Sequence, residues 1–111
     1  MVKLTGAAET PNGDPDGSGM AEVTISPDKG QVCYKLTVDK IATATAAHIH
    51  KGAAGSSGGP VVPLKAPASG SISDCATVAK EVAEDMVKNP ANYYVNVHNA
   101  EFPGGALRGQ L

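Results

Sequence analysis

The stretch EVTISPDKGQVCYKLTV, residues 22–38, decides the fold class of this chain. Polar and apolar residues alternate on both sides of PDKG, residues 27–30, as they do in strands that bury one face. Within those four residues, the early proline and the final glycine are typical of a hairpin turn. We therefore expect antiparallel strands at residues 22–26 and 31–38. The apolar face of the second strand is formed by Val32, Tyr34, Leu36 and Val38.

Similar short segments, separated by turns rich in glycine and proline, fill most of the remaining chain. We expect further strands at residues 2–8, 45–50, 61–64, 70–73, 93–98 and 106–111. Many short strands with regular turns predict a mostly β fold, namely an antiparallel, Greek-key-like β-sandwich or barrel.

One short helix is expected at about residues 77–88. In this segment Val78, Val82 and Met86 recur every four residues, which is the spacing of one helical face. Either Asp74 or Thr77 would cap the start of the helix, and an Asn-Pro pair at residues 89–90 would end it.

Length and composition limit the classes of protein to which the chain can belong. Its 111 residues correspond to one domain, residues 1–111, and 41% hydrophobic with 18% charged residues is the composition of a globular protein. The net charge is −2 and the basic residues are not clustered, so we expect no nucleic-acid partner. No apolar stretch approaches the roughly 20 residues that span a bilayer. A homodimer is left open.

Two cysteines, Cys33 and Cys75, suggest a disulfide if the protein is in an oxidising compartment. The alternative is two buried thiols in a cytosolic protein. Closing a loop of about 42 residues would stabilise the fold by roughly 3–4 kcal/mol. Cys33 lies on the face of its strand opposite the apolar face, so the two cysteines would have to meet at an edge of the structure.

The three histidines are the most informative residues for function. His48 and His50 are two residues apart on an expected strand, so they project from the same face, about 7 Å apart at the backbone. His98 ends the strand at 93–98 and shares a face with Asn96, opposite Val95 and Val97. If the two strands are neighbours, all three imidazoles gather at one site. The alternative is that they are ordinary surface histidines.

Three imidazoles suit copper, zinc, nickel or iron. Because no fourth protein ligand is evident, such a site keeps an open coordination position, as reactive metal sites do. Copper stands highest in the affinity order for nitrogen ligands, and zinc is the runner-up. Glu101 lies near His98 and would be either a weak fourth ligand, an acceptor for an imidazole N–H, or an exposed turn carboxylate.

Several motifs resemble the CHRD domain family, which is named for the repeats of chordin. They are LTGAAETP (residues 4–11), AAHIHKG (46–52), GPVV (59–62), YYVNVHN (93–99) and PGGALRGQL (103–111). The resemblance covers essentially the whole chain. It implies an antiparallel β-sandwich and an extracytoplasmic protein, periplasmic or secreted, whose leader is not present in this chain.

A weaker resemblance is to the copper–zinc superoxide dismutases, which carry a His-x-His on a barrel strand. It implies that His48, His50 and His98 are copper ligands and that Arg108 is a catalytic residue that draws the anion to the metal. The chain lacks a fourth copper histidine and the zinc histidines, so such an enzyme would use copper alone. For Arg108, the alternative is a structural ion pair at the sheet surface.

Together these patterns predict an extracytoplasmic copper-binding domain in which superoxide dismutation is the reaction to test. One alternative is a copper storage or transfer protein without catalysis. The other is an extracellular protein-interaction module in which the histidines only hold a loop.

Overall fold

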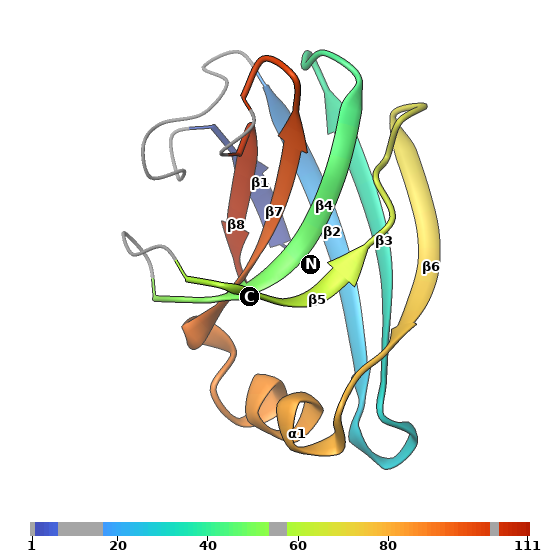
Figure 1. Ribbon diagram of the computed structural model, residues 1–111, viewed down its shortest axis with the longest axis vertical. Coiled ribbons are helices and arrows are strands. Elements are labelled where there is room, and N and C mark those ends of the chain that lie inside the picture. Colours follow the sequence, from blue (N-terminus) through green and yellow to red (C-terminus); the bar gives the residue numbers. More distant parts are fainter. Residues whose placement is uncertain (1, 7–16, 54–57, 103–104) are drawn as a thin grey trace.

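The computed structural model describes residues 2–6, 17–53, 58–102 and 105–111. In these residues the chain forms eight strands and one α-helix (Figure 1). The strands are β1 (Val2–Thr5), β2 (Ser18–Ser26), β3 (Gln31–Asp39), β4 (Ala44–Lys51), β5 (Pro60–Leu64), β6 (Ser71–Thr77), β7 (Tyr93–Asn99) and β8 (Leu107–Gln110). The helix α1 spans Lys80–Lys88, and the 3-10 turns η1 and η2 span Pro27–Lys29 and Pro90–Asn92. The turn between β2 and β3 was predicted correctly.

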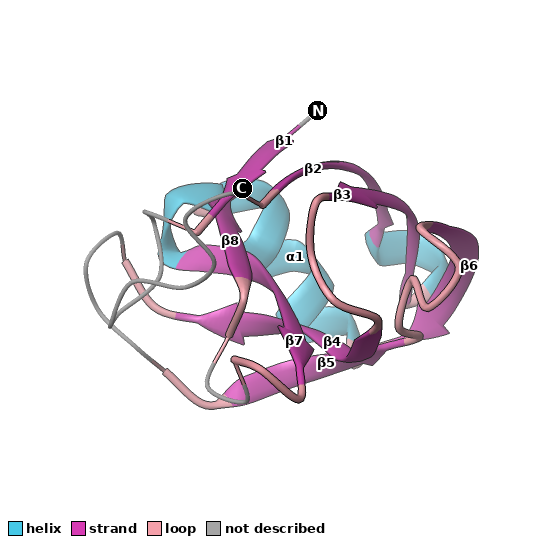
Figure 2. Cartoon of the chain, turned by 90° about the horizontal axis from the view of Figure 1, so that it is seen from above, coloured by secondary structure: helices cyan, strands magenta, loops and turns pink. Residues whose placement is uncertain are grey.

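The eight strands form one antiparallel sheet in the order β5-β4-β7-β8-β1-β2-β3-β6. The sheet curls into a nearly closed barrel, so that its two end strands, β5 and β6, approach each other (Figures 1 and 2). Just after β5, the backbone N–H of Lys65 donates to the Tyr34 hydroxyl at 2.9 Å, and the Lys65 ammonium pairs with Asp74 of β6, also at 2.9 Å. The prediction of a mostly β sandwich or barrel is confirmed.

The core lies inside the barrel and is formed by the alternate residues that the sequence pattern predicted. Val32, Tyr34 and Leu36 of β3 are buried there, whereas Val38 is only partly buried at the strand end. On β4 and β7 the inward residues include Ala47, Ile49, Val95 and Val97. The outward positions of β4 and β7 are therefore available for other roles.

The helix begins later than the sequence predicted. Thr77 is the last residue of β6, and α1 starts at Lys80, with no side chain capping its first turn. Asp74, the other of the two expected caps, lies within β6, where its carboxylate accepts the backbone N–H of Cys75 and pairs with Lys65. The helix ends at Lys88 with Asn89 as its C-cap, as expected, and lies at one end of the barrel, at the bottom of Figure 1. The described residues contain no helix long and apolar enough to cross a membrane.

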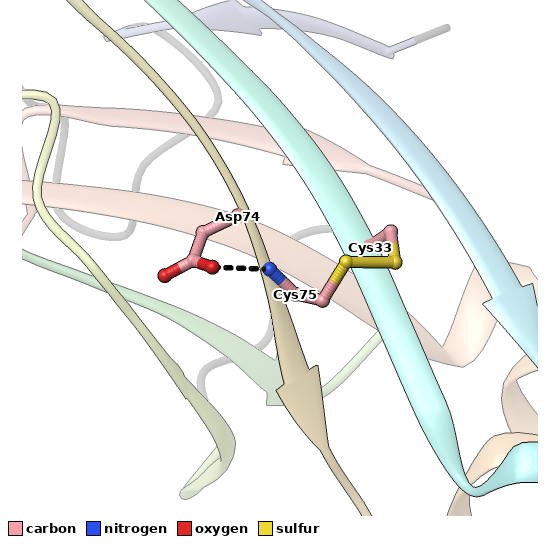
Figure 3. The surroundings of a disulfide bond; sticks show 3 residues. All are labelled: Cys33, Asp74 and Cys75. Atoms are coloured by element: carbon pink, nitrogen blue, oxygen red, sulfur yellow. Dashed lines mark hydrogen bonds between the residues drawn. A yellow bond between two sulfur atoms is a disulfide. The ribbon is translucent and has the colours of Figure 1, made fainter.

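Cys33 and Cys75 form a disulfide (Figure 3). The two residues are directly opposite each other where β3 pairs with β6, the last strand of the sheet. This register explains how a cysteine that points away from the core finds its partner. The disulfide lies on the outer side of the barrel, at the predicted edge, and links the end strand to the rest of the sheet.

Candidate metal centre

The pairing of β4 with β7 gathers the three histidines on the outer side of the barrel. In this antiparallel register Ala46 is opposite His98, His48 is opposite Asn96, and His50 is opposite Tyr94. Directly opposed residues project from the same face of a sheet. Because Ala47 and Ile49 face the core, the intervening residues of β4 and their partners on β7 face outward. The strands predicted to carry the histidines are therefore neighbours.

The three imidazoles form one compact cluster. One ring nitrogen from each of His48, His50 and His98 lies within 4.8 Å of the other two. The ring centroids are 5.4 Å apart for His48 and His50, 5.1 Å for His48 and His98, and 6.0 Å for His50 and His98. All three side chains are partly buried. The structure thus brings together every histidine that the sequence singled out.

The donor atoms fit a metal ion. Nδ1 of His48, Nε2 of His50 and Nε2 of His98 are buried ring nitrogens with no hydrogen-bond partner among the described residues. Leaving a buried polar atom without a partner costs about 1–3 kcal/mol of folding free energy, so a cation bound to these atoms would stabilise the folded protein. Three imidazoles that each bring one ring nitrogen within 4.8 Å of the other two suit a cation that accepts a lone pair from each ring.

The local electrostatics favour the form of imidazole that binds metals. Burial lowers the pKa of His48 below its ordinary value, and the nearby His50 ring lowers it further. His48 therefore stays neutral to lower pH than a histidine in water. A neutral imidazole keeps the lone pair that a metal requires.

His50 is held by two contacts beyond the cluster. Its Nδ1 lies 2.9 Å from the carbonyl oxygen of Gly58, which can only accept, so Nδ1 carries the proton. That leaves the lone pair on Nε2, which is buried and has no hydrogen-bond partner among the described residues. The ring also stacks on Tyr94, with centroids 4.9 Å apart and an angle of 4° between the planes.

Arg108 lies near the cluster but does not belong to it. Its side chain is only 2% exposed, and its guanidinium carbon lies 3.5 Å from the centroid of the Tyr94 ring. The guanidinium donates to the Ala53 carbonyl at 2.9 Å and to the Gln110 amide oxygen at 3.0 and 3.3 Å. The sequence suggested either an anion guide or a surface ion pair, whereas the structure places the residue inside a packed layer.

Sequence reasoning missed the residues around His50. Tyr94 could have been found, because it shares a face with Asn96 and His98 by strand alternation. Gly58 could not be identified in this way, because no sequence pattern indicates that its carbonyl oxygen contacts His50. Glu101 is exposed and is not part of the cluster of close donor groups, which fits the expected turn carboxylate.

Comparison with known proteins gives one result. The family model of the CHRD domain matches residues 1–111. No curated protein and no solved structure matches the chain.

Proposed function

Because this chain belongs to the CHRD domain family over its whole length, we propose that it is an extracytoplasmic domain that binds one copper ion through His48, His50 and His98. CHRD is an extracellular domain family, and the Cys33–Cys75 disulfide fits an extracytoplasmic location. The three-histidine cluster is compatible with metal binding. The identity of the metal and any turnover belong to the proposal.

The observation that carries the proposal is the cluster of three partly buried imidazoles, in which one ring nitrogen from each lies within 4.8 Å of the other two. Copper is favoured over zinc because it binds nitrogen ligands more tightly and is served by imidazole in both oxidation states. With three protein ligands, one position stays open for a small ligand or substrate.

A copper ion in this site would supply one-electron redox chemistry, of which superoxide dismutation is the simplest example. The chain's own contribution is to hold the three imidazoles together and to provide a positive potential near them. Arg108 is the source of that potential. Its guanidinium is occupied by Tyr94, Ala53 and Gln110, so it would act on an approaching anion through its charge rather than through contact.

The test is a titration of chelator-treated protein with Cu(II) against a competing ligand of known affinity. We expect one equivalent to bind, and His48→Ala or His98→Ala to weaken binding by more than about 100-fold, beyond what outer partners of a metal site contribute. Glu101→Ala is the matched control, because this nearby carboxylate lies outside the cluster and its loss should leave the affinity unchanged.

The same samples separate the alternatives. Rapid superoxide dismutation by the loaded protein would make it an enzyme, whereas tight binding without turnover would make it a copper carrier. Binding of copper and zinc no tighter than by the triple-alanine variant would contradict the proposal. The extracellular interaction module would then be the function to pursue.

A further inference from the structure

Tyr94 contacts His50 in two ways, directly and through Gly58. The two rings are stacked, and the Tyr94 hydroxyl accepts the backbone N–H of Gly58 at 3.2 Å. The carbonyl of the same glycine accepts Nδ1–H of His50 at 2.9 Å. The three residues therefore form a closed ring of contacts in which Tyr94 fixes both the plane of the imidazole and the position of its hydrogen-bond acceptor.

Only glycine fits at position 58. A Cβ atom built there would lie 1.6 Å from the carbonyl oxygen of Lys51, the residue that follows His50. The backbone of residue 58 thus lies directly against the end of β4. This close approach is what brings the Gly58 carbonyl within hydrogen-bond distance of the imidazole.

Arg108 holds Tyr94 from the other side. In the sheet, β7 lies between β4, which carries His50, and β8, which carries Arg108, so the two side chains approach Tyr94 from opposite neighbouring strands. A guanidinium 3.5 Å from a ring centroid is within the range of a cation–π contact. The His50 imidazole, the Tyr94 ring and the Arg108 guanidinium therefore form one layered unit.

Gln110 anchors this layered unit to the loops beside it. Its amide oxygen accepts from Arg108, and its amide nitrogen donates to the carbonyls of Gly52, Ala91 and Tyr93 at 2.8, 2.8 and 3.1 Å. The guanidinium of Arg108 is therefore fixed in the layer before any ligand arrives.

We propose that Tyr94 is a positioning residue for the metal centre: with the Gly58 carbonyl it holds His50 as the Nδ1-protonated tautomer, so that Nε2 faces the metal, and Arg108 keeps Tyr94 in place. The role of Tyr94 toward a metal rests on the proposed function, whereas the arrangement of His50 is a property of the metal-free protein. Outer partners of this kind orient the ligand and typically contribute about 10–100-fold to metal affinity.

The first experiment measures the tautomer of His50 in the metal-free protein by long-range proton–nitrogen correlation of the imidazole rings. We expect His50 to be protonated on Nδ1 alone. In Tyr94→Leu, which loses the ring stack and the hydroxyl, we expect a mixture of tautomers. Tyr94→Phe keeps the stack and loses the contact with Gly58, so its tautomer ratio should lie between those of the wild type and Tyr94→Leu.

The second experiment measures Cu(II) affinity and the electron paramagnetic resonance spectrum of the same variants. We expect Tyr94→Leu to bind about 10–100-fold more weakly and to show altered copper hyperfine splitting, with Tyr94→Phe intermediate. Tyr34→Phe is the control: this tyrosine is equally buried, at 4% exposure, and its hydroxyl also accepts one backbone N–H, but it lies on β3, which pairs with neither β4 nor β7. It should change neither readout.

The outcomes distinguish the two proposals. Protonation of wild-type His50 on Nε2 would overturn the positioning role, as would an unchanged tautomer and affinity in Tyr94→Phe and Tyr94→Leu. If Tyr94→Leu does not fold, Tyr94→Phe decides the matter alone. If the tautomer shifts as expected but wild-type protein binds no copper, the positioning of His50 stands and the proposed function fails.

Discussion

His50 and Tyr94 are directly opposed across β4 and β7, and their rings stack with 4.9 Å between centroids and 4° between planes. Nδ1 of the stacked imidazole lies 2.9 Å from the Gly58 carbonyl oxygen, and Nε2 is buried without a hydrogen-bond partner among the described residues. The stack and the Gly58 contact together therefore determine which nitrogen of His50 is available to a metal.

Gly58→Ala should disrupt the proposed metal centre without changing a proposed ligand. Its Cβ would overlap the Lys51 carbonyl, so the loop must move and the acceptor for His50 moves with it. We expect copper affinity to fall by about 10–100-fold, measured by competition titration. Gly59→Ala is the control, because a Cβ there meets nothing within 4 Å. Equal affinities for the two variants would show that the Gly58 contact is dispensable.

Removing the disulfide should affect stability but not the metal centre. In the double variant Cys33→Ala/Cys75→Ala, the free energy of unfolding should fall by about 3–4 kcal/mol, measured by urea denaturation. Copper affinity should be unchanged, because β3 and β6 do not pair with β4 or β7. A parallel loss of affinity would mean that the end strand β6 supports the histidine cluster.

The hydrogen bond from the Tyr93 hydroxyl to the Asp85 carboxylate should make stability depend on pH at both extremes. This bond, and a second one from Asn89, hold the pKa of Asp85 below 3.8, so its stabilising effect is present above pH 3.8 and is lost as the pH falls through the lowered value. Burial, and then the same bond, raise the pKa of Tyr93 from 10.0 to about 12, so that contribution is complete below pH 10.0 and disappears as the pH rises through about 12.

Unfolding free energies of the wild type and Asp85→Asn, measured across the pH range, test this linkage. Asp85→Asn should lose the part of the acid dependence that is due to residue 85, because asparagine does not titrate. Tyr93→Phe should lose the alkaline dependence due to residue 93. Profiles that run parallel to the wild type at both extremes would show that the pair does not contribute.

Arg108 offers a test of the proposed anion attraction. If its charge raises the rate with superoxide, Arg108→Met should lower kcat/KM by about 10-fold and weaken its dependence on ionic strength. Arg108→Lys keeps the charge and should retain most of the rate at low salt. Copper affinity is measured for each variant, so that a loss of metal is not mistaken for a loss of attraction. Equal rates for Arg108→Met and the wild type would remove Arg108 from the catalytic account.

Strand alternation was enough to predict most of the fold and the face that carries the histidines. It placed His48 and His50 together and His98 on the outer face of its own strand, because side-chain direction in a strand depends only on parity. It also identified the β3 residues that form the core. The start of the helix was misplaced because β6 continues through Thr77 by pairing with β3, and tertiary pairing of this kind outweighs helical periodicity.

The surroundings of the cluster could not be predicted in the same way. Gly58 contacts His50 and Ala53 contacts Arg108 from outside the strands, and each contact joins residues distant from each other in sequence or in the sheet. Nothing in the local pattern around Arg108 indicates that it is buried against an aromatic ring. Such contacts follow from the order of β4, β7 and β8 in the sheet, which the sequence pattern alone does not determine.

The most direct test of the central claim is the X-ray absorption spectrum of the protein loaded with one equivalent of copper. The account predicts nitrogen ligation with the multiple-scattering pattern of three imidazole rings, and fewer imidazoles in His48→Ala and in His98→Ala. A spectrum without imidazole scattering, or one that is the same in the triple-alanine variant, would contradict the three-histidine copper site.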